Sequence, residues 1–322
     1  MNTLASRSAA IVGAGAIGAW IADALDRAGW RISILARGET LATLRAQGLR
    51  VDRAGESRHC RPRAGSAAEL GEHDYVFLAV TAPVLPDLAP QLGALIGPSS
   101  VVISATNGIP WWFFHDFGGA LENQLLQSVD PQLTQERTFP RQRALGAVVH
   151  ASAKIAGPAH IQVVAADRLI LGEPDGGLTQ RVQEVVAGLR AGGINAQASS
   201  RIRLEVWAKL WGNMNMNPIS ALTRCGTGKM LASPAIRELC SRMMQEMQAC
   251  GQKLGLDLHM TPAERIAVTQ RLGDFKTSML ADLEAGRPLE LAPQLGAVVE
   301  IADRLGVPAV FCQSILGLAQ LL

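Results

Sequence analysis

The sequence is poor in cysteine and has no long apolar run, and each scarcity excludes a class of protein. Its five cysteines contain no CxxC pair and are too sparse for a disulfide framework; they are Cys60, Cys225, Cys240, Cys250 and Cys312. Reduced thiols of this kind predict a cytoplasmic protein. No apolar run reaches the ~20 residues that a membrane-spanning helix needs, so we expect no membrane partner.

An excess of charge of one sign is also missing. The 322 residues carry 30 basic and 28 acidic side chains, a formal net charge of +2, which provides no whole-protein field for a nucleic acid. Hydrophobic residues make up 48% of the chain and charged residues 18%, which excludes a disordered protein. The one local basic group, Arg58, Arg61 and Arg63 with His59, is interpreted as a solvated loop face.

The first 197 residues alternate short apolar runs with helical stretches. The predicted strands are 9–12, 31–35, 75–80, 101–104, 144–149, 161–164 and 168–171, and helices are expected over 20–27 and 178–191. This rhythm predicts an α/β domain with a Rossmann-type, doubly wound parallel sheet over 1–197. The irregular, aromatic-rich segment 111–143 is long for a connection, so we expect an insertion with its own helix or a lid.

Strand signals stop near residue 199, which predicts an all-helical domain over 198–322. Ser233 before Pro234 is a helix cap, and the helix that it opens should end near Gly255. Thr261 and Glu264 have the spacing of a capping box. The apolar C-terminal residues, ending LGLAQLL, favour a homodimer.

Residues 13–18 read GAGAIG directly after a predicted strand and before a predicted helix. In this context Gly13 permits the tight turn, Gly15 lets the backbone approach a pyrophosphate, and Gly18 lets helix and strand pack closely. The expected dinucleotide site is therefore Gly13, Ala14, Gly15, Ala16, Ile17 and Gly18. The alternative is a simple strand–helix turn.

The end of the second strand indicates which dinucleotide is preferred. An NAD enzyme usually carries Asp or Glu there, but this sequence has Ala36 followed by Arg37. A guanidinium suits a 2′-phosphate, so NADPH is the expected cofactor. An arginine without a ligand is the other interpretation.

The stretch EVWAKLWGNMNMNPIS, residues 205–220, carries the strongest sign of chemistry. Lys209, Asn213 and Asn217 recur every four residues and share one face of a helix, whereas Trp207 and Trp211 fall on the other face. Pro218 should end this helix. The polar face fits either a catalytic site or a buried structural network that joins helices.

With these motifs in view, the chain resembles the ketopantoate reductase (2-dehydropantoate 2-reductase) family over almost its whole length. The resemblance rests on GAGAIG, on Asn107–Gly108, on EVWAKLWGNMNMNP and on TSMLADLEAGRPLE near the end. It implies NADPH-dependent reduction of a small 2-keto acid, in pantothenate biosynthesis, without a metal.

The same resemblance assigns roles to residues. Lys209 would be the proton donor, and Glu290 would lie near the lysine and the cofactor. Asn107 would touch both the nicotinamide end and the substrate, and Ser152 would line the cofactor. Asn213, Asn217 and Ser278 would hold the substrate.

Two positions depart from the family pattern: Thr81 stands where a lysine is common, and Thr227 where an asparagine is frequent. These departures leave the substrate open between 2-dehydropantoate and a related 2-oxo acid. Other interpretations are a β-hydroxyacid dehydrogenase or imine reductase and a non-catalytic NADPH-binding sensor. The presence of Ser278 and Glu290 favours the keto-acid reductase over both of these alternatives.

Overall fold

The computed structural model describes residues 7–322, and their backbone contacts divide the chain into two compact units. Unit 1 comprises Met1–Thr106 and Leu133–Ile202, and unit 2 comprises Asn107–Gln132 and Arg203–Leu322. The expected division placed all of residues 1–197 in one domain. In the structure, residues 107–132 group with the helical unit, because the aromatic side chains of this segment pack there: the Phe113 and Trp207 rings are stacked with centroids 6.3 Å apart.

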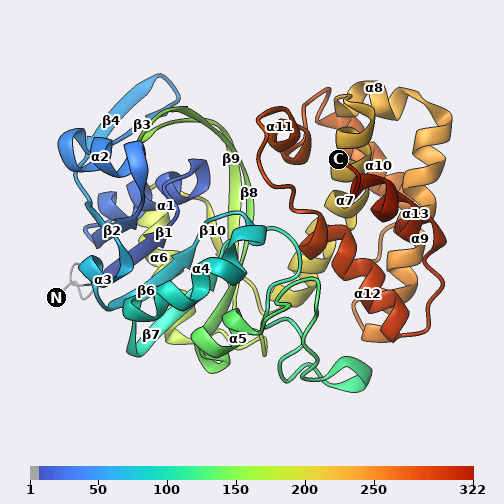
Figure 1. Cartoon of the computed structure of the whole chain (residues 1–322), viewed down its shortest axis with the longest axis horizontal. Helices are drawn as coiled ribbons and strands as arrows, with labels where there is room; N and C mark the ends of the chain where they lie inside the picture. Colours follow the sequence, from blue (N-terminus) through green and yellow to red (C-terminus); the bar gives the residue numbers. More distant parts are fainter. Residues whose placement is uncertain (1–6) are drawn as a thin grey trace. The chain divides into compact units, whose positions relative to one another are not determined.

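Unit 1 is built on a ten-stranded sheet (Figure 1). Its strands are β1 (Ser8–Val12), β2 (Arg31–Leu35), β3 (Leu49–Arg53), β4 (Glu56–Cys60), β5 (Arg63–Gly65), β6 (His73–Leu78), β7 (Ile96–Ser104), β8 (Ala144–Gly157), β9 (His160–Gly172) and β10 (Ala196–Ala198). The run β5-β2-β1-β6-β7-β8 is parallel and has the strand order of a dinucleotide-binding fold. This confirms the predicted Rossmann-type architecture.

Beyond the parallel run the sheet is mixed. β8 and β9 form a long antiparallel hairpin, β9 pairs in parallel with β3 and β10, and β3 pairs antiparallel with β4. The two segments 161–164 and 168–171, expected as separate strands, are parts of the single strand β9. Of the basic group, Arg58 and His59 lie on β4 and Arg63 on β5, whereas Arg61 lies in the connection between them. Arg58 is paired with Asp23 and Asp26.

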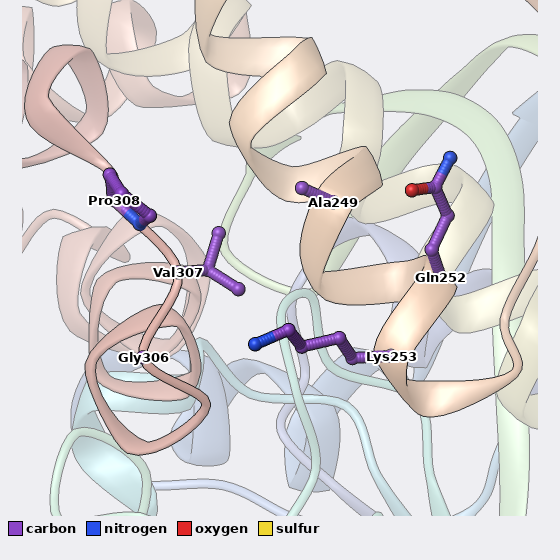
Figure 2. A pocket seen from close by; sticks show the side chains of 6 residues that line it. All are labelled: Ala249, Gln252, Lys253, Gly306, Val307 and Pro308. Carbon is purple, nitrogen blue, oxygen red and sulfur yellow. The ribbon is translucent and has the colours of Figure 1, made fainter.

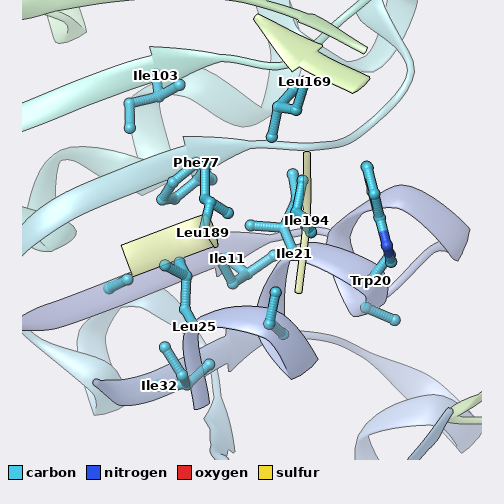
Figure 3. Close-up of a cluster of buried hydrophobic side chains, with 14 of the residues drawn as sticks. Ile11, Trp20, Ile21, Leu25, Ile32, Phe77, Ile103, Leu169, Leu189 and Ile194 are labelled. Carbon is cyan, nitrogen blue, oxygen red and sulfur yellow. The ribbon is translucent and has the colours of Figure 1, made fainter. Parts of the chain in front are cut away.

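The core of unit 1 lies between the sheet and two of its helices. The helices of the unit are α1 (Ala16–Arg27), α2 (Gly38–Gln47), α3 (Ala67–Leu70), α4 (Leu85–Leu92), α5 (Thr134–Thr138) and α6 (Gln180–Ala191). Ile11, Phe77 and Ile103 lie side by side on neighbouring strands and are fully buried (Figure 3). α1 and α6 pack together and supply Ile21 and Leu189 to this cluster. Each fully buried large side chain contributes roughly 1.5–3 kcal/mol.

Unit 2 is helical, as expected (Figure 1). It contains α7 (Ile202–Thr223), α8 (Thr227–Ala232), α9 (Pro234–Leu254), α10 (Pro262–Arg271), α11 (Ser278–Glu284), a π-helix at Ala292–Gly296, α12 (Ala297–Arg304) and α13 (Val310–Ala319). Both predicted caps are confirmed: Ser233 Oγ accepts from the Ile236 N–H, and Thr261 with Glu264 forms the capping box of α10. Among residues 7–322, no helix has the length and apolar character to cross a bilayer.

The prediction that Pro218 ends its helix is wrong, because α7 continues to Thr223. A proline inside a helix costs about 3 kcal/mol or more through the lost N–H and the ring clash. Ile219, Ser220 and Ala221, which follow the proline, are buried. Burial of this last turn outweighs the local preference, which a sequence pattern does not record.

Candidate functional site

The GAGAIG turn has the geometry that its glycines predict. Gly13 follows β1 with φ of +107°, and a Cβ there would lie 2.7 Å from a Val80 methyl group. A Cβ at Gly18 would lie 2.0 Å from the Gly13 carbonyl oxygen, so only glycine lets α1 begin this close to the turn. The turn that connects β1 to α1 is thus fixed by backbone packing.

The N-terminus of α1 is open to a ligand. Gly15 is its N-cap residue and makes no side-chain cap, and a Cβ at Gly15 would meet nothing within 4 Å. Ala14, Ala16 and Ile17 are half-buried. Uncapped N–H groups at a helix start, with the positive end of the helix dipole, fit a pyrophosphate. The residues present therefore fit the phosphates of a dinucleotide.

Arg37 lies at the same edge of the sheet as the glycine turn. Val12 and Leu35 are register partners, and the Gly13 N–H donates to the Leu35 carbonyl at 3.3 Å. Arg37 follows two residues later, is exposed, and is the N-cap residue of α2. A guanidinium at this edge fits a 2′-phosphate.

Thr81, which departs from the family pattern, and Ser152, a predicted cofactor contact, are both exposed. Thr81 follows β6 at the same carboxyl edge and is the N-cap residue of a short 3₁₀ turn. Ser152 lies on β8, beyond the row where Ser104 pairs with Gly146. Its contact with a cofactor stays a prediction.

In unit 2, three predicted residues are joined by hydrogen bonds although they are far apart in the sequence. Lys209 Nζ donates to Asn107 Oδ1 at 2.8 Å, and Asn107 Nδ2 donates to Glu290 Oε2 at 2.8 Å. The carboxamide of Asn107 therefore connects the ammonium of α7 with a buried carboxylate. Glu290 precedes the π-helix, and Lys209 lies in the middle of α7.

Gln294, which sequence reasoning missed, extends this network. Its Nε2 donates to Glu290 Oε2 at 3.2 Å, and its Oε1 accepts from Asn217 Nδ2 at 2.9 Å. Gln294 is fully buried and belongs to the π-helix. π-Helical turns are rare and are frequent at functional sites. Glu290 lies outside the helix that carries Gln294, so no α-helical i, i+4 spacing in the sequence linked the two residues.

Gly108 brings Asn107 to Glu290. Its φ is +85°, and a Cβ there would lie 2.4 Å from the Pro293 carbonyl oxygen. The same carbonyl accepts from the Ile109 N–H at 2.9 Å. The Asn–Gly pair thus anchors the 107–132 segment on the π-helix and sets the position of the Asn107 carboxamide.

Burial changes the acidity of Lys209. Desolvation of the ammonium lowers its pKa to about 8, and the nearby Glu290 carboxylate partly offsets this by favouring the charged form. A lysine with a pKa near neutrality can both carry a proton and give it up. Lys209 is therefore suited to general acid catalysis.

Asn213 and Ser278 are not joined to the network by a hydrogen bond in the structure. Asn213 lies one turn after Lys209 on α7 and is half-buried. Ser278 is exposed at the first position of α11, where the neighbouring Thr277 side chain is the cap. Both therefore have side chains available to a ligand.

A large surface pocket of unit 2 is separate from the polar network. It has a volume of about 450 Å³ and is lined by Lys253 and five uncharged residues of α9 and of the turn before α13 (Figure 2). Lys253 Nζ donates to the Leu305 carbonyl. This pocket contains none of the predicted site residues.

The segment expected as an insertion or lid is packed. Trp112, Phe113 and Phe114 are buried, and Arg203 of α7 lies over the Phe117 ring with Cζ 5.1 Å from its centroid. The Glu300 carboxylate accepts from the N–H groups of Gln127 and Ser128. Residues 111–132 of this segment are therefore an integral part of unit 2, whereas residues 133–143, which include α5, belong to unit 1.

Comparison with known proteins identifies the family. The family model described as Ketopantoate reductase PanE/ApbA matches residues 9–176, and its C-terminal counterpart matches 201–322. The chain belongs to the ketopantoate reductase family. A curated 2-dehydropantoate 2-reductase from Mesorhizobium japonicum is 39% identical over 312 residues, covering 96% of each chain.

Solved structures of the ketopantoate reductase family agree with this membership. A Ralstonia solanacearum MolK2 protein assigned to the family has 41% identity and a TM-score of 0.92, with 98% of this chain and 97% of that chain covered. The 2-dehydropantoate 2-reductase of Methylococcus capsulatus has 26% identity and a TM-score of 0.83, with 98% and 96% covered. The predicted family and its two-part architecture are confirmed.

Proposed function

We propose that the protein is an NADPH-dependent oxidoreductase that reduces a 2-keto acid to a 2-hydroxy acid, with 2-dehydropantoate, or a close analogue of it, as substrate and pantoate as product. The observation that carries this proposal is the hydrogen-bonded set of Lys209, Asn107 and Glu290. The set occurs in a chain that is 39% identical to an enzyme named for this reaction. Unit 1 serves as the cofactor domain and unit 2 as the substrate domain.

The residues of the cofactor domain hold NADPH by its phosphates. The backbone of residues 13–18 and the start of α1 bind the pyrophosphate, and Arg37 binds the 2′-phosphate. Ser152, Asn107 and Glu290 complete the proposed cofactor contacts. When bound, NADPH supplies the hydride.

Lys209 supplies the proton. Reduction of a ketone leaves negative charge on the former carbonyl oxygen, and a positioned ammonium stabilises this charge and then protonates the oxygen. The bond from Lys209 Nζ to Asn107 Oδ1 orients the ammonium, and Glu290 keeps it charged. The ammonium performs the task of a Lewis acid, so the reaction needs no metal.

Asn213, Asn217 and Ser278 bind the substrate. Asn217 is held by Gln294, so one edge of its carboxamide is fixed. Neutral amides and a hydroxyl orient a carboxylate and a substrate hydroxyl without changing the charge of Lys209. Membership in the ketopantoate reductase family argues against the β-hydroxyacid dehydrogenase and imine reductase alternatives.

The test is a screen of NADPH oxidation by the purified protein against 2-dehydropantoate, other 2-keto acids and an imine. Lys209→Ala serves as the matched control. We expect turnover with 2-keto acids that depends on Lys209 and that is faster with NADPH than with NADH. NADPH binding without oxidation by any of these compounds would favour the sensor alternative and reject the proposal.

The proposal includes a cytoplasmic homodimer. All five cysteines are unpaired, and four of them are buried. Val310, Phe311 and Leu318 of α13 are exposed apolar side chains, which suit an interface between two copies. Sedimentation of the protein and of Leu318→Glu tests the dimer: we expect a dimer that the substitution weakens, and a monomeric parent would reject it.

A further inference from the structure

A guanidinium occupies the space of a missing side chain on α7. Arg265 is the fourth residue of α10, and its Nη2 lies 2.1 Å from the position that a Cβ would take at Gly212. Gly212 is in the interior of α7, where glycine is destabilising relative to alanine. The structure thus keeps an unfavourable helix residue at the point where Arg265 approaches α7.

The charge of Arg265 has no counterion among the described residues. Its Nη1 donates to Thr269 Oγ1 at 2.9 Å, and none of the carboxylates whose side chains the structure describes, which leaves out Asp167 and residues 1–6, lies within ion-pair distance. Burial lowers its pKa, and no nearby acid opposes that effect. Two other arginines of unit 2 are paired, Arg287 with Asp282 and Arg304 with Glu300. A desolvated cation is unfavourable unless an anion accompanies it.

The position of this cation connects it with the proposed substrate site. Gly212 follows Lys209 by three residues and precedes Asn213 directly, so Arg265 approaches the turn of α7 that carries both. Arg265 is half-buried, so a small ligand can reach it. Its other N–H groups have no acceptor among the described residues.

We propose that Arg265 binds the carboxylate of the 2-keto acid and is therefore a specificity-determining residue. A guanidinium forms strong charge-assisted hydrogen bonds with a carboxylate, and the ligand supplies the missing counterion. Asn213 then contacts the same end of the substrate, and Lys209 remains available for the carbonyl oxygen. This inference rests on the proposed function, because the ligand is its substrate.

The first test compares Arg265→Gln with the parent and with Arg271→Gln, an exposed arginine at the end of the same helix. We expect Arg265→Gln to raise the KM for 2-dehydropantoate about 10- to 100-fold, as for the loss of a charged hydrogen bond. Its kcat and its Kd for NADPH should change less than threefold. Arg265→Lys should recover part of the loss, and Arg271→Gln should behave as the parent. An unchanged KM in Arg265→Gln would overturn the inference.

Gly212→Ala tests the same claim without removing the arginine. The new methyl group must displace the guanidinium, whose flexible end can move. We expect a raised KM together with a Tm that is unchanged or higher, because alanine favours the helix. A purely structural role for Arg265 predicts the reverse: a lower Tm and an unchanged KM.

Calorimetry with pantoate as the probe, in the presence of NADP⁺, separates this inference from the proposed function. If the parent turns over 2-keto acids but Arg265→Gln binds pantoate as tightly as the parent, the inference fails and the function stands. If the parent shows no turnover but its binding of pantoate depends on Arg265, the function fails and the carboxylate site stands.

Discussion

The glycine turn of unit 1 and the polar network of unit 2 are built in different ways. The turn is made of backbone: Gly13 and Gly18 fit it because they have no side chain, and the groups that we propose to bind the cofactor are the N–H groups at the start of α1. The network is made of side chains from three separate segments, which carry Asn107, Lys209 and Glu290. In the proposed function, unit 1 therefore binds the cofactor mainly through its backbone, and the side chains that carry out the reaction belong to unit 2.

This contrast predicts that substitutions in the two units separate binding from chemistry. Substitution of Lys209, the network member that is not a proposed cofactor contact, should reduce turnover and leave NADPH binding intact. Changes at the turn or at Arg37 should do the opposite.

Lys209→Ala should have the largest effect. Loss of the general acid should lower kcat by about 10²- to 10⁴-fold, with the Kd for NADPH changed less than twofold. Stopped-flow turnover and fluorescence titration of NADPH measure the two quantities. Near-normal turnover of this variant would remove the lysine from the mechanism.

Arg37→Ala should come next, with the opposite signature. We expect weaker NADPH binding by about 10- to 100-fold, because a charged hydrogen bond contributes roughly 1.5–3 kcal/mol, and little change for NADH. Arg31→Ala is the control, since Arg31 is exposed at the other end of β2. Equal losses for both cofactors would show that the 2′-phosphate is bound elsewhere.

Glu290→Gln should lower kcat roughly tenfold and change its pH dependence. Glu290 raises the pKa of Lys209, so its neutralisation lowers that pKa further. The loss of activity at high pH should therefore begin at a lower pH than in the parent. The glutamine can still accept a hydrogen bond from Asn107, so the variant changes mainly the charge. An unchanged pH profile would show that the charge of Glu290 does not influence the pKa of Lys209.

Gln294→Leu should have the smallest effect on turnover, a reduction of a few fold. The variant leaves Asn217 without its acceptor and removes a donor to Glu290, which costs about 1–3 kcal/mol of stability for buried polar groups. A lower Tm by thermal denaturation is therefore expected. Gln183→Leu, at an exposed position of α6, is the control and should change neither quantity.

Local patterns predicted much of the fold and of unit 1. The apolar runs of β1, β2, β6 and β7, the capping box at Thr261 and the GAGAIG turn all depend on residues close in sequence. The strands β3, β4 and β5 were missed because they are short and rich in charged residues. The prediction that Pro218 ends its helix was wrong because burial of the following turn outweighs the tendency of proline to end a helix.

For the polar network of unit 2, the sequence indicated the residues Asn107, Lys209 and Glu290 but not the hydrogen bonds that join them. Asn107 and Glu290 are 183 residues apart, and their contact depends on the packing of Gly108 against Pro293. The π-helix that orients Gln294 has no sequence signature. The counterion-free Arg265 was equally invisible, because a missing partner is a property of three-dimensional surroundings.

The pH dependence of kcat/KM in the parent and in Lys209→Arg tests the central claim most directly. We expect activity of the parent to fall above a pKa of about 8, as the Lys209 ammonium loses its proton. An arginine stays charged at these pH values, so the residual activity of Lys209→Arg should lack this decrease. A parent profile that stays flat up to pH ~10, or an unchanged decrease in the variant, would contradict the assignment of Lys209 as the proton donor.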